Sequence, residues 1–515
     1  HRRTTASAAK ENKETKPAKR APTFFTLTID HPAPGRSVMA SAAAASSPRQ
    51  ADDAQQAQLP HVVIFPFMAK SHTIPLTHLA HLLRRRELAT VTFVTTPGNA
   101  AFVRAALSGA DDGVSVVELP FTDDHAMVPA AECLEALDSS LSSLPAFVEA
   151  VESALRPRFE RALAAMRPRA SVVVADAFLH WAHAAAAALG VRTLAFFVAN
   201  MFAHVVRDVC VSHNPAAVLT SGAPDAAFFT VPELPHVRLA LADIPMDAKV
   251  GRAFADSQGL IVNTFDAMES QYIEHWNRHI GPRAWPVGPL CLARPTPTSW
   301  HGDATAWMRW LDEKAAAGRA VLYVALGTFM AVREAQLNEV ADGLEQSGLD
   351  FLWAVRPADV VLPAGFEERV RGRGMVVREW VDQWAILRHE CVKGFFSHCG
   401  WNSTLESISA GVPLAAWPMG AEQPLNVNLA VDELRIGLKV SAGHGISGLV
   451  SSEEIVTVAR ELMMGGEKGA EAARNAAAMA VKAREAVAEG GSSWKALQEL
   501  ISGLNRPGGH ASMEK

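Results

Sequence analysis

The chain has 515 residues, more than one hydrophobic core usually serves, and at about 150 residues per domain we expect two or three domains, two of them large. Its residues are 49% hydrophobic and 20% charged with a formal net charge of −6, which is typical of soluble globular proteins and not of nucleic-acid binders. No uncharged apolar run reaches about 18 residues, so we predict no membrane span.

The N-terminal residues 1–58 differ from the rest of the chain. Lys and Arg side chains lie there among Ala, Ser, Thr and Pro with little periodicity, and we expect a disordered extension whose basic residues are solvated. It is either a transit peptide or translated sequence upstream of a true start at Met39, and because the chain begins with His we favour the second. Whether residues 1–38 belong to the native protein stays open.

From residue 61 the sequence alternates β-rich runs with helical patterns. In the first half we predict strands at residues 61–67, 90–95, 114–119, 171–174 and 191–197, with helices at about 75–86, 140–166 and 180–189. Such an alternation favours right-handed βαβ units in a parallel, doubly wound sheet.

A Pro-rich segment at residues 291–303 reads as a linker, and a second series of strands follows it at 320–326, 351–355, 375–377, 393–397 and 414–417. The fold class is therefore α/β, with an N-terminal domain at 59–290 and a C-terminal domain at 304–480. We expect the last helices, 481–505, to pack back on the N-terminal domain. Two similar sheets joined by a linker imply a cleft between them.

The five cysteines are scattered and lack CxxC or zinc-type spacing: Cys133, Cys210, Cys291, Cys391 and Cys399. We expect neither a disulfide framework nor a structural metal, and a reducing compartment, the cytoplasm, fits this pattern.

Polar residues follow several strands, where ligands bind in open α/β sheets. They are Ser71, His72, Asp176, Gly327, Thr328 and His398. The densest group follows residue 396, where a strand turns through Gly400 into a helix whose N-terminus, with His398, Asn402 and Ser403, suits a diphosphate. Ser403 and Glu406 also fit a capping box that needs no ligand, and the motif alone leaves the two readings even.

The wider segment, residues 380–423, begins WVDQW, continues through FFSHCGWNSTLES and GVP, and ends EQ. It resembles the plant secondary-product glycosyltransferase box over all 44 positions. With further motifs at 259–265, 286–290, 310–312, 323–328 and 490–493, the resemblance to plant family 1 UDP-dependent glycosyltransferases covers about residues 59–505. It implies a GT-B fold, which has two facing Rossmann-like domains and an interdomain cleft.

The resemblance also implies the donor site. Trp380 would stack on uracil, with the Val381 backbone and Gln383 on its edge, and Glu406 would accept the ribose hydroxyls. Diphosphate ligands would be Thr328, His398, Asn402 and Ser403 beside Gly400, and sugar ligands Trp401, Glu422 and Gln423. A terminal Gln in this box usually accompanies glucose donors and a His galactose donors, so we expect UDP-glucose.

A lone loop histidine is usually structural, but His72 occupies the place of the family's catalytic histidine. A neutral imidazole there could take the acceptor's hydroxyl proton. Asp176 follows another strand of the same sheet and would orient that imidazole, the alternative being a helix N-cap.

Three residues depart from the family pattern: Ser71 replaces a common Gly, Thr328 a usual Ser, and Val198 a Thr that contacts the sugar in some relatives. The last change weakens the assignment of the donor. Residues 443–448 fit GxGxxG, but the next helix has its own cap at Ser451, so we expect no dinucleotide site. His78 and His81 lack further ligands, and we predict a solvated helix face.

We therefore expect an inverting displacement, in which a hydroxyl deprotonated by His72 attacks C1 of the donor sugar, UDP leaves and a β-glycoside forms. The scheme requires no metal or other cofactor. The acceptor would be a small lipophilic plant metabolite, a flavonoid, phenolic, terpenoid or hormone, bound by loops near 121–144 and 197–211. Its identity and the oligomeric state stay open, and a monomer is compatible with this chemistry.

Two other functions would share parts of this sequence pattern. A nicotinamide-dependent oxidoreductase needs a glycine fingerprint after the first strand, which residues 67–72 lack. A catalytically silent UDP-sugar-binding protein would keep the box but could lose the base or its partner, and this chain has both His72 and Asp176.

Overall fold

The computed structural model describes residues 59–108, 113–121, 132–136, 144–213, 228–231, 234–240, 248–294, 305–327, 332–356, 360–440 and 448–504. All of them belong to one compact unit, Gln58–Lys515. The expected N-terminal extension, most of the expected linker, Thr328 and most of the 443–448 motif lie outside the described residues, as does much of the 121–144 loop.

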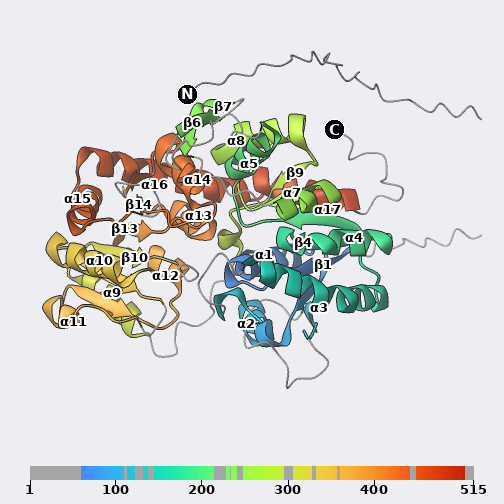
Figure 1. Ribbon diagram of the computed structural model, residues 1–515, viewed down its shortest axis with the longest axis horizontal. Helices are drawn as coiled ribbons and strands as arrows, with labels where there is room; N and C mark the ends of the chain where they lie inside the picture. Colours follow the sequence, from blue (N-terminus) through green and yellow to red (C-terminus); the bar gives the residue numbers. More distant parts are fainter. Residues whose placement is uncertain are drawn as a thin grey trace, which may run out of the picture. The chain divides into compact units, whose positions relative to one another are not determined.

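The first half contains a seven-stranded, wholly parallel sheet in the order β3-β2-β1-β4-β5-β8-β9. Its strands are β1 (His61–Phe65), β2 (Thr90–Thr95), β3 (Val114–Glu118), β4 (Val172–Asp176), β5 (Arg192–Phe196), β8 (Leu260–Val262) and β9 (Ala284–Pro286). The accompanying helices are α1 (Lys70–Arg85), α2 (Pro97–Leu107), α3 (Leu144–Ala165), α4 (His180–Ala188), α5 (Met201–His213), α7 (Ala248–Asp256) and α8 (Asp266–His275). An antiparallel pair, β6 (Phe228–Val231) and β7 (Leu234–Ala240), stands apart from this sheet (Figure 1).

The second half repeats the design with six parallel strands in the order β12-β11-β10-β13-β14-β15. They are β10 (Val321–Ala325), β11 (Asp350–Ala354), β12 (Gly374–Val377), β13 (Val392–Ser397), β14 (Leu414–Ala416) and β15 (Gly437–Lys439). Its helices are α9 (Ala306–Ala316), α10 (Glu334–Ser347), α11 (Phe366–Arg369), α12 (Gln383–Leu387), α13 (Trp401–Ala410), α14 (Gln423–Val427), α15 (Ser452–Met463), α16 (Glu467–Val487) and α17 (Ser492–Leu504). Short helical turns are η2 (Leu134–Ala136), η4 (Ala177–Leu179), η6 (Trp276–Ile280), η7 (Leu290–Ala293) and η8 (Asn428–Glu433).

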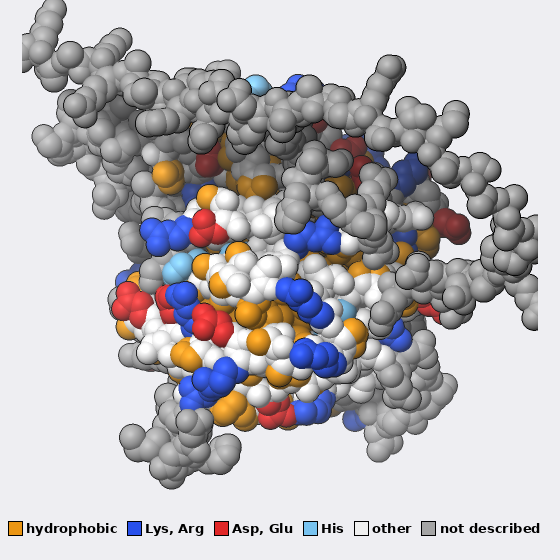
Figure 2. All heavy atoms as spheres, turned by 90° about the vertical axis from the view of Figure 1, so that its right-hand side faces the viewer, with side chains coloured by type: hydrophobic (Ala, Val, Ile, Leu, Met, Phe, Trp, Pro, Cys, Tyr) orange, Lys and Arg blue, Asp and Glu red, His pale blue; other side chains and the backbone are white. Residues whose placement is uncertain are grey.

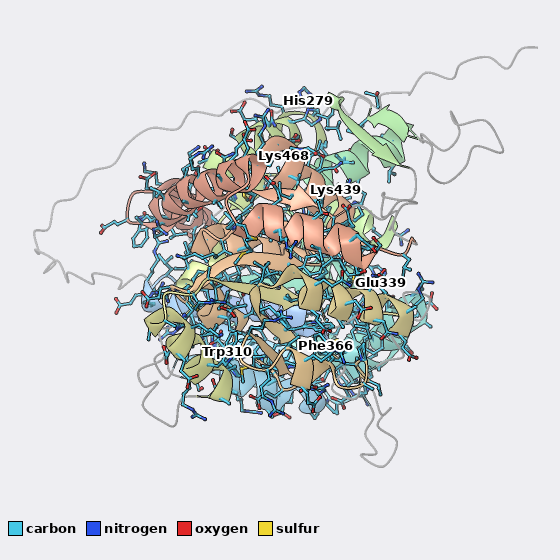
Figure 3. The ribbon with its side chains drawn as sticks, turned by 90° about the vertical axis from the view of Figure 1, so that its left-hand side faces the viewer. His279, Trp310, Glu339, Phe366, Lys439 and Lys468 are labelled. Carbon is cyan, nitrogen blue, oxygen red and sulfur yellow. The ribbon has the colours of Figure 1, made fainter. Side chains whose placement is uncertain are left out.

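Both sheets are covered on two faces, as their apolar strands predicted. In β1, Val62 and Ile64 pack in one core cluster while Val63 and Phe65 pack in another, since alternate side chains of a strand point to opposite faces. In the second half, α11 carries the buried Phe366 (Figure 3). Its ring meets that of Trp353 from β11 edge-on at 6.1 Å.

The C-terminal helix α17 packs against the edge strand β9 of the first sheet (Figure 1). Ser493 Oγ donates to the Gly288 carbonyl at 2.6 Å, and the Arg192 guanidinium donates to the last carbonyls of the helix, Gly503 at 3.3 Å and Leu504. Helix α17 is therefore held against the first sheet by both its first and its last turn.

Helix α1 begins at Lys70, five residues before the position expected from the apolar pattern. Pro75 therefore lies inside the helix and not at its start. The sequence placed His72 in a loop, whereas the structure places it in the first turn of this helix, after the N-cap Ala69. Pro75 lies beyond the first turn, so its missing N–H removes one helical hydrogen bond, the one to the Ser71 carbonyl. Asn402 Nδ2 donates to that carbonyl instead, at 2.6 Å.

Candidate active site

His72 and Asp176 lie together at the carboxyl ends of β1 and β4, which are neighbours in the sheet. His72 Nδ1 and Asp176 Oδ2 are 2.7 Å apart, and both side chains are buried. The other carboxylate oxygen accepts the Phe178 N–H at 3.0 Å and caps η4. The cap and the orienting partner, which the sequence offered as alternatives, are thus two oxygens of one carboxylate. A proton on Nδ1 leaves Nε2 as the basic nitrogen.

The surroundings of His72 work in two directions on its pKa. Burial by itself lowers the pKa, because the charged imidazolium loses water, but the charge and hydrogen bond of Asp176 raise it, as do Glu422 and Glu135 more weakly. The net pKa is raised above the usual 6.5. His72 therefore binds a proton more readily than a free imidazole, and Asp176 stabilises the resulting cation.

Aromatic rings surround this base. The rings of Phe67, Phe178 and Phe197 have their centroids 5.7, 5.5 and 5.9 Å from that of His72. Phe178 and Phe197 also meet edge-on at 5.2 Å. Phe67 is fully buried, whereas Phe178 and Phe197 are partly exposed, so an apolar, flat molecule beside His72 can pack on the latter two rings.

The N-terminus of α13 lies beside His398, a buried and neutral histidine. The helix follows β13 through Cys399, whose φ of 62° is left-handed, and has Gly400 as its N-cap. A Cβ at Gly327 or Gly400 would come within 2.9 or 2.7 Å of the His398 ring, so both glycines make room for that imidazole. Burial lowers the pKa of His398 to about 4, and the ring is neutral at neutral pH. It can therefore serve as a hydrogen-bond donor to an anion but not as a cation.

Ser403 is the third residue of α13 and not its cap, so the capping-box alternative was wrong. Its Oγ instead accepts a hydrogen bond from Gln383 Nε2 at 3.0 Å. The same amide donates to Glu406 Oε2 at 2.8 Å, and Tyr323 Oη donates to Gln383 Oε1 at 3.3 Å. Burial raises the pKa of Glu406 to about 7. Three residues expected on base, ribose and phosphate thus form one hydrogen-bonded group.

Trp380, the expected uracil platform, has 48% of its surface exposed. Cations from both halves of the chain lie near its ring, Lys70 Nζ at 4.5 Å and the Arg356 guanidinium carbon at 5.1 Å. Next to the buried Val381, Asp382 caps α12 and forms a two-bond pair with Arg294 at 2.6 and 2.7 Å. Arg294, at the end of η7, therefore holds the loop that carries Trp380.

The residues expected to bind the sugar lie at the N-termini of two helices, α13 and α14. Glu422 is the N-cap of α14, and it affects the pKa of His72 electrostatically. Gln423 Oε1 accepts N–H groups of Met419 at 2.8 Å and Gly420 at 3.2 Å, which leaves its amide nitrogen to donate. The indole N–H of the buried Trp401 donates to the Asn263 carbonyl at 2.9 Å, so its side chain serves the contact between the halves.

Two histidines correct the sequence analysis. His78 and His81 were expected on a solvated helix face, but only 8% and 1% of their surfaces are exposed. Helix α1 packs against both α2 and η7, which covers the face that carries them. Burial lowers the pKa of His78 to about 3, with nearby Arg294 adding to the effect.

Two further features concern the described ranges, namely metal-binding clusters and membrane-spanning helices. Among those residues no group of three or more His, Cys, Asp or Glu side chains could hold a metal ion. No helix there is long and apolar enough to cross a membrane. All five cysteines are free thiols in the structure. The helix after the 443–448 motif begins at its own cap, with Ser451 Oγ accepting the Glu454 N–H at 3.3 Å.

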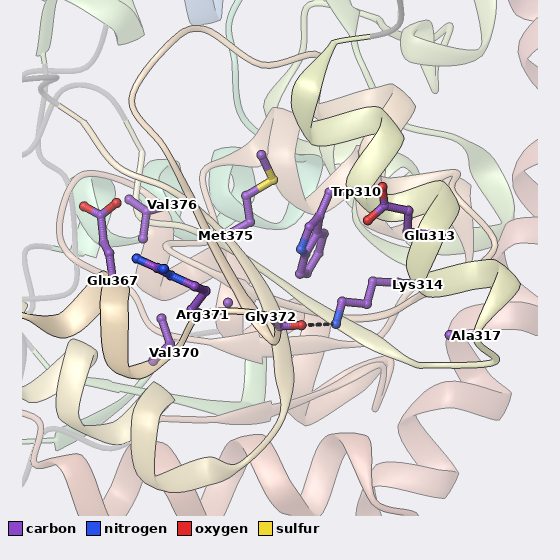
Figure 4. Close-up of a pocket in the computed structure, with 11 residues that line it drawn as sticks. Trp310, Glu313, Lys314, Ala317, Glu367, Val370, Arg371, Gly372, Met375 and Val376 are labelled. Carbon is purple, nitrogen blue, oxygen red and sulfur yellow. Dashed lines mark hydrogen bonds between the residues drawn. The ribbon is translucent and has the colours of Figure 1, made fainter.

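A cavity of 470 Å³ lies away from these residues, beside the edge strand β12. Figure 4 shows Trp310 and Lys314 of α9 facing Arg371 and Glu367 across it, with Lys314 Nζ donating to the Gly372 carbonyl at 2.6 Å. None of the expected site residues lines it. Among the described residues on the face drawn in Figure 2, acidic and basic side chains are interspersed with apolar ones.

Sequence reasoning missed several contacts that join the halves at this site. Asn402 Nδ2 donates to the Ser71 carbonyl at 2.6 Å, and Asn200 Nδ2 donates to Asn426 Oδ1 at 2.9 Å. The partners are far apart in the chain, and no local pattern predicts them. Only Asn200 offered a signal, because an Asn before an apolar helix is a common N-cap.

The halves of the chain match two family models. Residues 60–292 match the model described as glycosyltransferase, N-terminal domain, and residues 303–463 match that of UDP-glucoronosyl and UDP-glucosyl transferase. UDP-glycosyltransferase 90A1 of Arabidopsis thaliana is 39% identical over 469 residues, which cover 86% of this chain and 96% of that protein. UDP-glucose flavonoid 3-O-glucosyltransferase 7 of Fragaria ananassa is 33% identical over 480 residues, with 86% and 96% covered.

Solved structures agree with this assignment. Glycyrrhiza uralensis UGT73P12, complexed with glycyrrhetinic acid 3-O-monoglucuronide, superposes with a TM-score of 0.76 at 29% identity, covering 87% of this chain and 96% of that one. Phytolacca americana UGT2, complexed with UDP-2fluoro-glucose and pterostilbene, gives 0.69 at 29% identity, with 86% and 99% covered. The expected GT-B fold is confirmed. With its two parallel sheets and the His72 and Asp176 pair beside the box, the chain belongs to the plant family 1 UDP-glycosyltransferases and is an enzyme of that family.

Proposed function

We propose that the enzyme transfers glucose from UDP-glucose to a hydroxyl group of a small lipophilic metabolite and forms a β-glycoside with inversion at C1. The observation that carries this proposal is the 2.7 Å pair of His72 Nδ1 and Asp176 Oδ2 on one half, joined to the helix start of the donor box by the Asn402 to Ser71 hydrogen bond of 2.6 Å. A base and an anion-binding helix N-terminus thus lie next to each other.

In this mechanism His72 Nε2 accepts the proton of the acceptor hydroxyl while its oxygen attacks C1 of the sugar. The bond from C1 to the β-phosphate oxygen breaks, and UDP leaves with the electron pair. The imidazolium is stabilised by Asp176, 2.7 Å away. Negative charge on the leaving phosphate meets the free N–H groups of α13 together with Asn402 and Ser403, which are fixed before the reaction. We propose that Thr328 and His398 also contact the diphosphate and that no metal or other cofactor takes part.

The glucose donor is supported by the Gln423 amide and by the local charge. Asp176, Glu422 and Glu135 all act on His72 as negative charges, so the reaction centre disfavours a sugar that carries its own carboxylate. Gln423 is held by the N–H groups of Met419 and Gly420 and offers a neutral donor. The Fragaria ananassa relative is named for UDP-glucose.

The acceptor class is supported by the partly exposed rings of Phe178 and Phe197 beside His72. Relatives are named for flavonoid, anthocyanin and scopoletin acceptors. We propose a flavonoid or related phenolic ahead of a terpenoid or hormone, because a flat aromatic acceptor can pack against phenylalanine rings in the geometries that aromatic pairs prefer. A cytoplasmic location, expected from the cysteine pattern, is part of the same proposal.

A UDP-release assay tests the function. UDP-glucose, UDP-galactose, UDP-xylose and UDP-glucuronate are each combined with phenolic and terpenoid alcohols, with His72→Ala as the control. Acceptor-dependent release from UDP-glucose that disappears in the variant supports the proposal. Tight UDP binding without release from any pair would favour the silent-binder alternative.

A further inference from the structure

Two fully buried asparagines connect the halves of the molecule beside the sugar residues. Asn200 lies between β5 and α5 in the first half, and Asn426 lies in α14 in the second, and each has 0% of its surface exposed. Asn200 Nδ2 donates to Asn426 Oδ1 at 2.9 Å. Because buried polar groups are normally hydrogen-bonded, the other amide atoms of this pair should also have hydrogen-bond partners.

Backbone groups at the two ends fix the direction of this arrangement. The Ala203 N–H donates to Asn200 Oδ1 at 2.7 Å, so the amide nitrogen of Asn200 must face Asn426. Asn426 Nδ2 then donates to the Cys399 carbonyl at 2.9 Å and to Glu422 Oε1 at 3.4 Å. An N–H at one end and a carbonyl at the other permit only one orientation of both amides.

Each end reaches an element of the reaction site. Cys399 forms the left-handed turn between His398 and the N-terminus of α13, and Asn426 holds its carbonyl. Glu422, beside Gln423, is one of the expected sugar ligands. At the other end, Asn200 follows Phe197, whose ring lies 5.9 Å from that of His72.

We propose that Asn200 and Asn426 are positioning residues. They hold Glu422 and the turn at Cys399 in place, so that the transferred sugar is oriented toward His72. The inference rests on the proposed transfer from a UDP-sugar and assigns a role to two residues outside both the expected donor ligands and the His72 and Asp176 pair. The pair would act on the glycosyl group and not on the uridine end, whose expected ligands are Trp380, Gln383 and Glu406.

The test separates this role from the ordinary capping role of Asn200. Asn200→Ser keeps a good N-cap for α5, because a Ser side chain accepts the N–H equally well, but it is too short to reach Asn426. Asn200→Asp also keeps the cap and turns the donor into a second acceptor. Asn277→Ala is the matched control, since the Asn277 amide oxygen accepts the Ala284 N–H within the first half at 2.8 Å.

Dissociation constants for UDP and for UDP-glucose, or for another UDP-sugar that the wild type turns over, are measured by calorimetry, with KM and kcat alongside. In Asn200→Ser we expect UDP affinity within about twofold of the wild type, while KM for the UDP-sugar rises about tenfold and kcat falls by a similar factor. Asn200→Asp should behave alike, and Asn277→Ala should leave both constants unchanged.

Wild-type KM and kcat in Asn200→Ser would overturn the proposal, as would an equal loss of UDP and UDP-sugar affinity, which is the result of general loosening. Melting temperatures identify a variant that fails to fold. If Asn200→Ser fails to fold, Asn426→Ser removes the same hydrogen bond from its other side. The binding comparison needs no acceptor, so it distinguishes failure of this inference from failure of the transferase proposal, in which the wild type itself releases no UDP.

Discussion

The side-chain amide of Asn402 donates a hydrogen bond of 2.6 Å to the backbone carbonyl of Ser71. In a regular helix that carbonyl would accept from the N–H four residues later, but that residue is Pro75, which has no N–H. The proline inside α1 therefore leaves an acceptor next to His72, and the donor-site helix α13 uses it. A sequence feature that weakens one helix thus connects the base to the expected phosphate ligand.

Asn402→Ala should lower kcat/KM for the donor about 10- to 100-fold, because it removes a hydrogen bond between the halves and a donor to the charged diphosphate, together worth about 1.5–3 kcal/mol. Steady-state kinetics with varied UDP-glucose check this. Asn402→Asp should be worse, since its carboxylate would face both a carbonyl and a phosphate. An Asp variant as active as the wild type would mean that neither contact matters.

The sequence predicted the parts of this site that depend on strand order. Alternating apolar runs placed β1 and β4 in one parallel sheet, and neighbouring strand ends bring His72 and Asp176 together. Ser403 was ambiguous because a capping box and a ligand position have the same letters, and only the helix start at Trp401 separates them.

Other features depend on packing that no short pattern encodes. The spacing of His78 and His81 is the same on an exposed and on a buried helix face. Contacts of α1 with α2 and η7 bury the face that carries them. The partners Asn200 and Asn426 are 226 positions apart, so their meeting follows only from how the halves dock.

The pH profile of kcat/KM should report His72. Only the neutral imidazole can accept a proton, so activity should fall as pH drops through its pKa, which lies above 6.5 despite the opposing effect of burial. Asp176→Asn removes the charge that raises this pKa and leaves burial, so the acid limb should move below pH 6.5. Its kcat should fall about 100-fold or more, since the imidazole loses its orienting partner and its stabilised cation.

The measurement is a pH–rate profile from pH 5 to about 9 with saturating acceptor for both proteins. An acid limb that stays in place in Asp176→Asn would show that another group titrates. A UDP binding constant unchanged by the substitution is the control for folding.

Glu406 gives a separate pH dependence in nucleotide binding. Burial raises the pKa of its carboxyl to about 7, and the ionised form is the better acceptor for ribose hydroxyl groups. UDP affinity should therefore fall as pH drops from about 8 to 6. Glu406→Gln should bind UDP more weakly at pH 8 and lose most of this dependence, which calorimetry at several pH values can check. A variant with the wild-type slope would point to the phosphate as the titrating group.

The Arg294 and Asp382 pair should contribute to nucleotide affinity although neither residue is expected to touch the nucleotide. The guanidinium and carboxylate form two hydrogen bonds at 2.6 and 2.7 Å and are partly buried, and Asp382 lies two residues after Trp380. Asp382→Asn keeps the cap on α12, because Asn caps as well as Asp, but loses the charge. We expect about a three- to tenfold rise in the dissociation constant for UDP, and similar for Arg294→Lys, whose ammonium cannot form the paired bonds.

A double-mutant cycle on UDP binding measures the coupling, which we expect to be about 1 kcal/mol. The exposed pair of Arg278 and Glu274, with a distance of 2.8 Å but within a single helical stretch of the first half, is the matched control. Its cycle should give no measurable coupling to UDP binding, because solvent screens an exposed ion pair far from the platform loop. Equal effects for both pairs would mean that charge in general, and not the hold on the Trp380 loop, sets the affinity. Additive single effects at Arg294 and Asp382 would show that the two residues act independently of their paired bonds.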